Sequence, residues 1–361
     1  MDFLTLPTSP FTLQNVTVPA WSVGQEGDLL RCDLHVAGDR FTDTPGPPVE
    51  MKGAMALPAF VDAHTHLDKG HIWPRASNPD GTFMGALNTV RADHANWSAE
   101  DVKTRAEFSI RAAYAHGTRA IRTHLDSMAG QYAISWPVLA DLRSTWAGRV
   151  ELQMVSLLTC ERYDDPEYTL IADAVADHGG VLGLVTYPLP ELKRMLRGHF
   201  EAAGQRGLSV DFHTDETMDP ASETLRMIAE TVLETGFDAP VVVGHCCSLS
   251  TQDEARALDT LDLVAKAGLQ VVSLPMCNLY LQDRHAARTP RGRGVTLVHE
   301  MKARGIPVAF ASDNTRDPFY AYGDMDMVEV MREATRIAHL DHSDPDWSRA
   351  VSPTPAEICG F

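Results

Sequence analysis

Short apolar runs alternate with longer amphipathic stretches along most of this chain of 361 residues. Several of the apolar runs follow a glycine of the kind that ends a helix, as at Gly117, Gly207 and Gly268. The alternation predicts parallel strands connected by helices. The predicted strands cover residues 57–64, 119–126, 150–159, 181–189, 208–216, 239–246, 269–276 and 306–314.

The helical stretches carry their own boundary signals. Ser98 opens a capping box with Asp101 at the start of a predicted helix that ends near Gly117, and a later helix is predicted over about residues 324–338. Eight strands alternating with helices predict an α/β fold, a closed (β/α)8 TIM-type barrel. A doubly wound open sheet is the alternative, but no glycine-rich dinucleotide-binding turn follows the first strand.

The two ends of the chain depart from this alternation. Residues 1–56 are rich in proline and contain two strand-like pieces, 11–18 and 29–38, which predict a small β appendage. We therefore predict an N-terminal β appendage over residues 1–56, a barrel over 57–345 and a tail over 346–361 that is a candidate to complete the appendage.

Polar side chains gather where the predicted strands end. In a barrel the carboxyl ends of all strands form one rim, and active sites lie there. His64 and His66 end the first strand, and side chains two residues apart on a strand point the same way, so this pair is a two-pronged metal ligand. The other strand ends contribute His124, Asp126, His213, Asp215, Glu216, His245, Asp313 and Asn314.

Imidazole nitrogens combined with one carboxylate suit zinc or ferrous iron. His213 and Asp313 would complete such a set from across the rim. A hydrogen-bonded strand histidine is the alternative for any single residue, but four ligand-type side chains at strand ends favour a metal. We predict one divalent metal ion, Zn2+ or Fe2+, with the ligands His64, His66, His213 and Asp313.

These residues also carry a resemblance to a known family. The histidines of predicted strands one, five and six, with Asp313 on strand eight, resemble the metal-dependent hydrolases of the amidohydrolase superfamily. The stretches "DFHTDE", "VGHC" and "SDNTRDPFYAYGD" look more narrowly like its cytosine deaminase branch, over about residues 57–339. The resemblance implies that Glu216 is the proton shuttle and that His245 lies beside the activated water or the substrate.

The chemistry of such a site can be stated by residue. A divalent metal ion lowers the pKa of a bound water to roughly 7. Asp313 would accept the proton of this water, and Glu216 would protonate a ring nitrogen and then the leaving nitrogen. His245 would donate a hydrogen bond to the oxygen on which charge develops.

Two predicted substrate-binding residues are cations near the rim. Lys69 closely follows the histidine pair, where it would either bind a carbonyl-rich or anionic heterocycle or form an ion pair with Asp68. Arg284 follows the seventh strand and is preferred as a pocket residue over its neighbours Asn278 and Gln282. A salt bridge within the loop is the alternative for Arg284.

Two further predicted substrate-binding residues depart from the cytosine deaminase pattern. Thr159, with Cys160 as the alternative, ends the third strand where that branch has a glutamine. Asn314 stands where the branch has a second aspartate. A site built to hydrogen-bond one polar edge loses specificity when its partner changes, so these residues put cytosine itself in doubt.

Composition narrows the partners. The net charge of −18 disfavours nucleic acid and anionic membrane surfaces, because their phosphates would be repelled. No leader sequence and no apolar run long enough to span a bilayer is present, and the six cysteines lack zinc-finger spacing, which predicts reduced thiols in the cytoplasm. The partners expected are a small N-heterocyclic substrate and further copies of the chain, since relatives are usually homo-oligomers.

The most direct interpretation is a metal-dependent hydrolase that attacks a carbon–nitrogen bond of a small N-heterocycle, a cytosine deaminase-like enzyme that releases ammonia. A cyclic amidohydrolase, or an alkylaminohydrolase acting on a triazine-like ring, would use the same site and is the nearest alternative. A barrel that binds a metal or ligand without catalysis is the alternative of a different class.

Overall fold

The structure is a computed structural model that describes residues 6–38, 40–343 and 345–361. The contacts divide the chain into two compact units. One contains the described residues up to Ala59 together with Asp341–Ser348, and the other contains Phe60–Leu340 together with Arg349–Phe361. In the part of the chain that the structure describes, no helix combines the length and the apolar character needed to cross a membrane.

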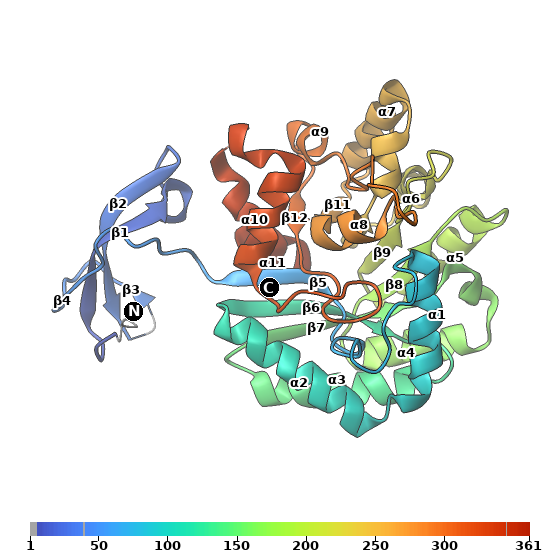
Figure 1. The fold of residues 1–361 in the computed structure, drawn as a ribbon, viewed down its shortest axis with the longest axis horizontal. Helices are drawn as coiled ribbons and strands as arrows, with labels where there is room; N and C mark the ends of the chain where they lie inside the picture. The colour runs from blue at the N-terminus through green and yellow to red at the C-terminus, as the bar shows by residue number, and fades with distance from the viewer. Residues whose placement is uncertain (1–5, 39, 344) are drawn as a thin grey trace. The chain divides into compact units, whose positions relative to one another are not determined.

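The larger unit contains one strand for each of the eight predicted strands (Figure 1). Seven of them are shorter than predicted, whereas the second, over 118–126, is one residue longer. The strands are β5 (Phe60–Thr65), β6 (Thr118–Asp126), β7 (Glu151–Leu157), β8 (Leu182–Thr186), β9 (Val210–Thr214), β10 (Val241–His245), β11 (Gln270–Ser273) and β12 (Val308–Phe310).

These strands are parallel and follow one another in sequence order. Two continuous sets, β5-β6-β7 and β8-β9-β10-β11-β12, are joined on one side where the Val181 amide donates to the Met154 carbonyl at 2.9 Å. On the other side the Asp313 amide donates to the His64 carbonyl at 2.9 Å. Backbone hydrogen bonds therefore run around the whole ring, and the predicted (β/α)8 barrel fold is confirmed.

Helices connect the strands at the predicted positions. The Ser98 hydroxyl accepts a hydrogen bond from the Asp101 amide at 3.3 Å, which confirms the N-cap half of the predicted capping box, whereas the Ser98 amide donates to the Asn96 carbonyl at 2.9 Å and not to Asp101. The later helix begins at Met327, because the Asp326 carboxylate accepts from the Val328 amide at 2.8 Å. The helices are α1 (Phe83–Asp93), α2 (Ala99–Ala115), α3 (Tyr132–Trp146), α4 (Glu167–Asp177), α5 (Leu192–Arg206), α6 (Thr224–Thr235), α7 (Glu254–Lys266), α8 (Pro275–Leu281), α9 (Val298–Ala303), α10 (Met327–Ala338) and α11 (Pro353–Cys359).

The smaller unit is built on a four-stranded sheet in the order β3-β2-β1-β4. Its strands are β1 (Phe11–Pro19), β2 (Leu29–Ala37), β3 (Arg40–Phe41) and β4 (Pro48–Glu50), so both strand-like pieces recognised in the sequence are strands. Within this unit the Trp21 indole donates to the Ser348 hydroxyl at 3.0 Å. A segment distant in sequence is thereby tied to the sheet.

The last residues divide differently from the predicted tail. α11 belongs to the barrel unit, and its Ile358 and Cys359 are buried in one core cluster with Ala63 and Val272. The Cys359 carbonyl also accepts a hydrogen bond from the Gln153 side chain at 3.1 Å. Burial of this short apolar helix against the strands explains why residues 349–361 belong to the barrel.

Candidate metal centre and its cavity

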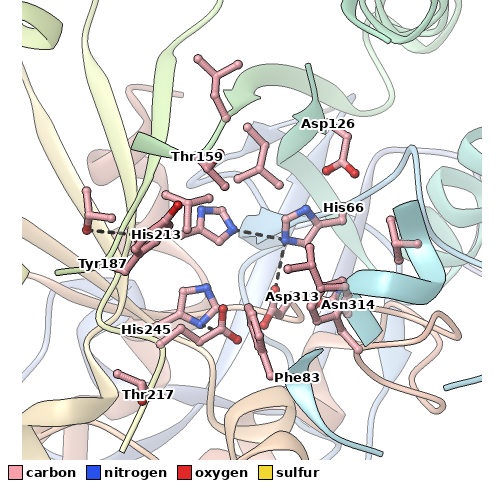
Figure 2. A pocket seen from close by; sticks show the side chains of 18 of the residues that line it. His66, Phe83, Asp126, Thr159, Tyr187, His213, Thr217, His245, Asp313 and Asn314 are labelled. Carbon is pink, nitrogen blue, oxygen red and sulfur yellow. Dashed lines mark hydrogen bonds and ion pairs between the residues drawn. The ribbon is translucent and has the colours of Figure 1, made fainter. Parts of the chain in front are cut away.

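Three imidazoles and one carboxylate meet at the rim of the barrel. The Nε2 atom of His213 lies 3.0 Å from Nε2 of His64 and 3.4 Å from Nε2 of His66. One carboxylate oxygen of Asp313 lies 3.3 Å from Nε2 of His66 and 3.8 Å from Nε2 of His64. Figure 2 shows His66, His213 and Asp313 turned toward one another. The four predicted metal-ligand residues are thus brought together.

Backbone geometry at the strand ends directs these side chains. His213 lies on β9, and its backbone pairs with Gly244 of β10 in register. His245 and Asp313 have positive φ angles of 69° and 62°, which L side chains rarely adopt. Such strained residues persist only when the surroundings hold them, and they gather at functional sites. Here the hydrogen bond from the Asp313 amide to His64 holds the strained residue.

The chemistry of the donor set fits a divalent cation. Burial lowers the pKa of His64, His66 and His213 well below the usual value, so their imidazoles are neutral, which is the form that binds metals. Burial raises the pKa of Asp313 to about 7, and apart from a weak contact with the Cys277 thiol its carboxylate has no hydrogen-bond donor among the described residues. A buried carboxylate without a strong donor is costly unless a cation binds it. The cluster is therefore suited to a metal ion.

A second group of buried polar residues lies against the His64 ring. The His124 ring lies against the His64 ring, with 3.9 Å between centroids. Its Nε2 atom is 3.3 Å from Asp211, whose other carboxylate oxygen accepts from the Arg122 guanidinium at 2.8 Å. His124, Asp211 and Arg122 are all buried. The ring contact restricts movement of the His64 ring, and His124 itself lies close enough to His64 and His213 to be a further ligand-type side chain.

Glu216 and His245 lie beside the cluster. Oε1 of Glu216 is 3.5 Å from Nδ1 of His245, and the Asn278 amide nitrogen is 3.0 Å from the same Nδ1. Burial, followed by the nearby charge of Asp313, raises the pKa of Glu216 well above its usual value. Burial lowers the pKa of His245 to about 3. A carboxyl group that keeps its proton therefore stands next to a neutral imidazole.

Asp215, the neighbour of Glu216, has a structural role. Its carboxylate accepts hydrogen bonds from the Ser222 hydroxyl at 2.6 Å, from the Thr224 amide at 3.0 Å and from the Leu225 amide at 2.9 Å. These donors lie at the start of α6, so Asp215 satisfies the exposed amides of that helix end. Glu216 is left as the carboxyl group that faces His245.

Lys69 is buried and lines the cavity beside the cluster. Its Nζ atom forms an ion pair with Asp126 at 2.7 Å, and the other oxygen of Asp126 is 3.0 Å from Nε2 of His94. Burial alone would lower the pKa of Lys69, but Asp126 and then Asp68 raise it. The ion pair therefore forms with Asp126 and not with Asp68, because the Asp68 carboxylate instead accepts from the Asp126 amide at 2.7 Å.

The other predicted substrate-binding residues are divided between two cavities. Thr159 and Asn314 line the same cavity as the cluster. Asn314 is held in place because its amide donates to Asp317 at 2.7 Å. Arg284 instead lines a neighbouring cavity, where its guanidinium lies over the Tyr280 ring at 4.4 Å from the centroid. Arg284 therefore does not line the cavity beside the cluster.

The cavity above the cluster has a volume of about 440 Å³ and mostly apolar walls. Part of one wall is α1, which contributes Phe83, Leu87 and Val90. We made no prediction for this helix. Its signal is present in the sequence, because Thr82 is an N-cap residue and the three apolar residues follow at helical spacing. Phe83 packs edge to face against Phe319, with 5.4 Å between ring centroids.

Comparisons with known proteins find similar chains. Residues 168–361 match the model of the Amidohydrolase family. The chain is 51% identical over 376 residues to a pterin deaminase of Rhizobium rhizogenes, and the match covers 99% of this chain and 86% of the relative.

The six cysteine side chains form no disulfide bonds.

Solved structures show the same fold. The 5-methylcytosine deaminase of Klebsiella pneumoniae with bound phosphonocytosine superimposes with a TM-score of 0.82 and 24% identity, over 97% of this chain and 87% of that one. The N-isopropylammelide isopropylaminohydrolase of Burkholderia multivorans superimposes with a TM-score of 0.74 and 25% identity, over 98% of this chain and 88% of that one.

Proposed function

Because the chain belongs to the amidohydrolase family, we propose that it deaminates a pterin, a 2-amino-4-oxopteridine, by hydrolysis with the help of one divalent metal ion. The predicted family and the predicted class, a hydrolase acting on carbon–nitrogen bonds other than peptide bonds, are confirmed. The meeting of three neutral imidazoles and one carboxylate without a strong donor among the described residues, at the floor of a cavity, is the observation that carries the metal-dependent chemistry. The pterin ring is proposed from the relative that is 51% identical.

The metal ligands in this proposal are His64, His66, His213 and Asp313, and the metal is zinc or ferrous iron, which both accept imidazole and carboxylate ligands. A divalent ion held there would lower the pKa of a bound water from about 16 to about 7 and so supply hydroxide at neutral pH.

The residues around the cluster would then handle the protons. Asp313, whose carboxylate lies beside the three imidazoles, accepts the proton of the attacking water. Glu216 keeps a proton at neutral pH, because its pKa is raised, and gives this proton to a ring nitrogen. One proton of the attacking water then passes through Glu216 to the leaving amine, and the other restores the Glu216 carboxyl group. His245 donates a hydrogen bond to the oxygen that gains charge. Water adds its oxygen to C2, the C2–N bond breaks, and one ammonia leaves for each 2,4-dioxopteridine formed.

The cavity supports a flat bicyclic substrate. Its volume of about 440 Å³ and its apolar wall, with Phe83 and Phe319, suit a planar ring larger than a pyrimidine. Lys69 and Asp126 supply one cation and one anion on the same wall, which match a carbonyl group next to a ring N–H. Thr159 offers no amide edge of the kind that the cytosine deaminase branch uses.

Hydrolysis of an alkylaminotriazine is the second candidate, and the likeness to an N-isopropylammelide isopropylaminohydrolase favours it. The two candidates release different amines. The metal-loaded chain should be assayed with pterin, cytosine, guanine and N-isopropylammelide, with ammonia and isopropylamine measured separately. Ammonia from pterin in equal amount to the dioxopteridine is expected. Isopropylamine without pterin turnover would support the triazine hydrolase, and no product from any substrate would support a non-catalytic barrel.

Three statements about the wider setting stay predictions from the sequence. They are assembly into a homo-oligomer, a cytoplasmic location and the lack of a nucleic-acid partner. Size-exclusion chromatography with light scattering would test the first of them.

A further inference from the structure

Asn278 is a buried amide that contacts two groups of the proposed machinery at once. Its Nδ2 atom lies 3.0 Å from Nδ1 of His245 and 3.4 Å from Oε1 of Glu216. We propose that Asn278 is a positioning residue that fixes the tautomer of His245, so that the Nε2–H group of His245 is the hydrogen-bond donor of the cavity. The inference deepens the proposed function and rests on it for the role of His245.

The tautomer follows from hydrogen-bonding rules. A neutral imidazole has one N–H donor and one acceptor nitrogen, and only this form accepts a hydrogen bond. The amide nitrogen of Asn278 can only donate, so Nδ1 of His245 must accept. The proton of the ring then belongs to Nε2. This atom is buried and has no hydrogen-bond partner among the described residues, although His245 lines the cavity.

The orientation of the Asn278 amide is itself determined by its surroundings. With the amide turned over, its oxygen would replace its nitrogen at 3.4 Å from Oε1 of Glu216 and 3.0 Å from Nδ1 of His245, and neither atom would receive a donor from Asn278. The observed orientation gives both Glu216 and His245 a donor. Two backbone hydrogen bonds of α8 fix the position of Asn278. Its backbone N–H donates to the Leu274 carbonyl at 3.0 Å, and its backbone carbonyl accepts from the Gln282 N–H at 2.9 Å.

The hydrogen bond from Asn278 also keeps His245 from acting as a metal ligand. One of its ring nitrogens lies close enough to His64 and Asp313 for the three residues to form a group that could hold an ion. A nitrogen that carries a proton cannot bind a metal, and the other nitrogen is occupied by Asn278. His245 is therefore left as a donor, which is the role that a developing oxyanion requires.

The test compares the full-length, zinc-loaded wild-type chain with Asn278→Asp, in which a carboxylate replaces the donor. Nitrogen-15 NMR of labelled histidines reads the tautomer, and the His245→Gln spectrum identifies the signal of His245. We expect Nε2–H in the wild type and Nδ1–H in N278D. With pterin as substrate, kcat of N278D should fall about 10²–10³-fold, while KM and zinc content change little, because one preorganised donor is lost.

Two further variants keep the result interpretable. Asn88→Asp makes the same chemical change on the exposed side of α1 and should leave the His245 signal and kcat unchanged. Asn278→Ser removes the amide without adding a charge and replaces N278D in the test if N278D folds poorly. We expect the His245 signal of N278S to show a mixture of tautomers.

An unprotonated Nε2 in the wild type, or an unchanged His245 signal in both Asn278 variants, would overturn the inference. The tautomer is read without substrate. A failure to deaminate pterin would therefore overturn the proposed function, while the NMR result alone would still decide the role of Asn278.

Discussion

Gly244→Ala tests whether metal binding depends on the observed position of the His64 ring. Gly244 lies on β10, and a Cβ atom there would be 3.0 Å from Cε1 and 3.2 Å from Nδ1 of His64. These contacts are closer than carbon atoms normally tolerate, so the ring must move by a few tenths of an ångström. The His124 ring lies against the His64 ring at 3.9 Å and restricts that movement. The variant therefore displaces one proposed ligand without changing any ligand atom.

The size of the effect follows from the tolerance of metal coordination. Metal–ligand distances are held to about 0.2 Å, so a displacement of a few tenths of an ångström weakens one of four bonds. Changes to the groups that support metal ligands typically cost 10–100-fold in metal affinity. We expect the zinc affinity of G244A to fall by about 10–100-fold, which corresponds to about 1.4–2.8 kcal/mol.

The assay is the zinc dissociation constant, measured at one pH by competition with a chromophoric chelator. Gly204→Ala is the matched control, because Gly204 lies on α5 and a Cβ atom there meets nothing within 4 Å. The melting temperature of each metal-free protein shows whether the barrel itself is weakened. A G244A affinity within twofold of the G204A affinity would refute the claim that His64 must stay in place to bind the metal.

Three other predictions follow from the same structure. Glu216→Gln should retain the metal but lower kcat on pterin by about 10²–10⁴-fold, because the carboxyl that carries the proton is lost; unchanged turnover with full metal content would exclude the shuttle role. Asp211→Asn leaves the buried guanidinium of Arg122 without its ion-pair partner and should lower the free energy of unfolding by about 3–5 kcal/mol, as measured by urea titration, and a loss below about 1 kcal/mol would contradict it. Burial lowers the pKa of His199 from 6.5 to about 4, so below pH 6.5 the unfolded chain binds the extra proton and stability falls as the pH falls through that range. The part of this loss due to His199 should be about 1.6 kcal/mol between pH 6.5 and pH 5, so the free energy of unfolding of His199→Gln should fall by about that much less than that of the wild type; equal pH dependence in both proteins would contradict it.

The sequence already contained the fold and the centre of the site. Strand positions could be read because burial of a strand needs a run of apolar residues, and this run is a local property of the chain. His64 and His66 could be paired because alternate residues of a strand face the same side. His213 and Asp313 could be added because the ends of parallel strands in a barrel meet at one rim, whatever their separation in sequence.

Only the tertiary structure decided which partners the remaining polar groups have. It gave Lys69 the carboxylate of Asp126 in place of Asp68, placed Arg284 in a neighbouring cavity and brought Asn278 against His245. These contacts depend on how loops from different strands approach one another in space. A local pattern sets period and burial, but ångström-scale distances between residues far apart in the chain are set by the packing of the whole barrel.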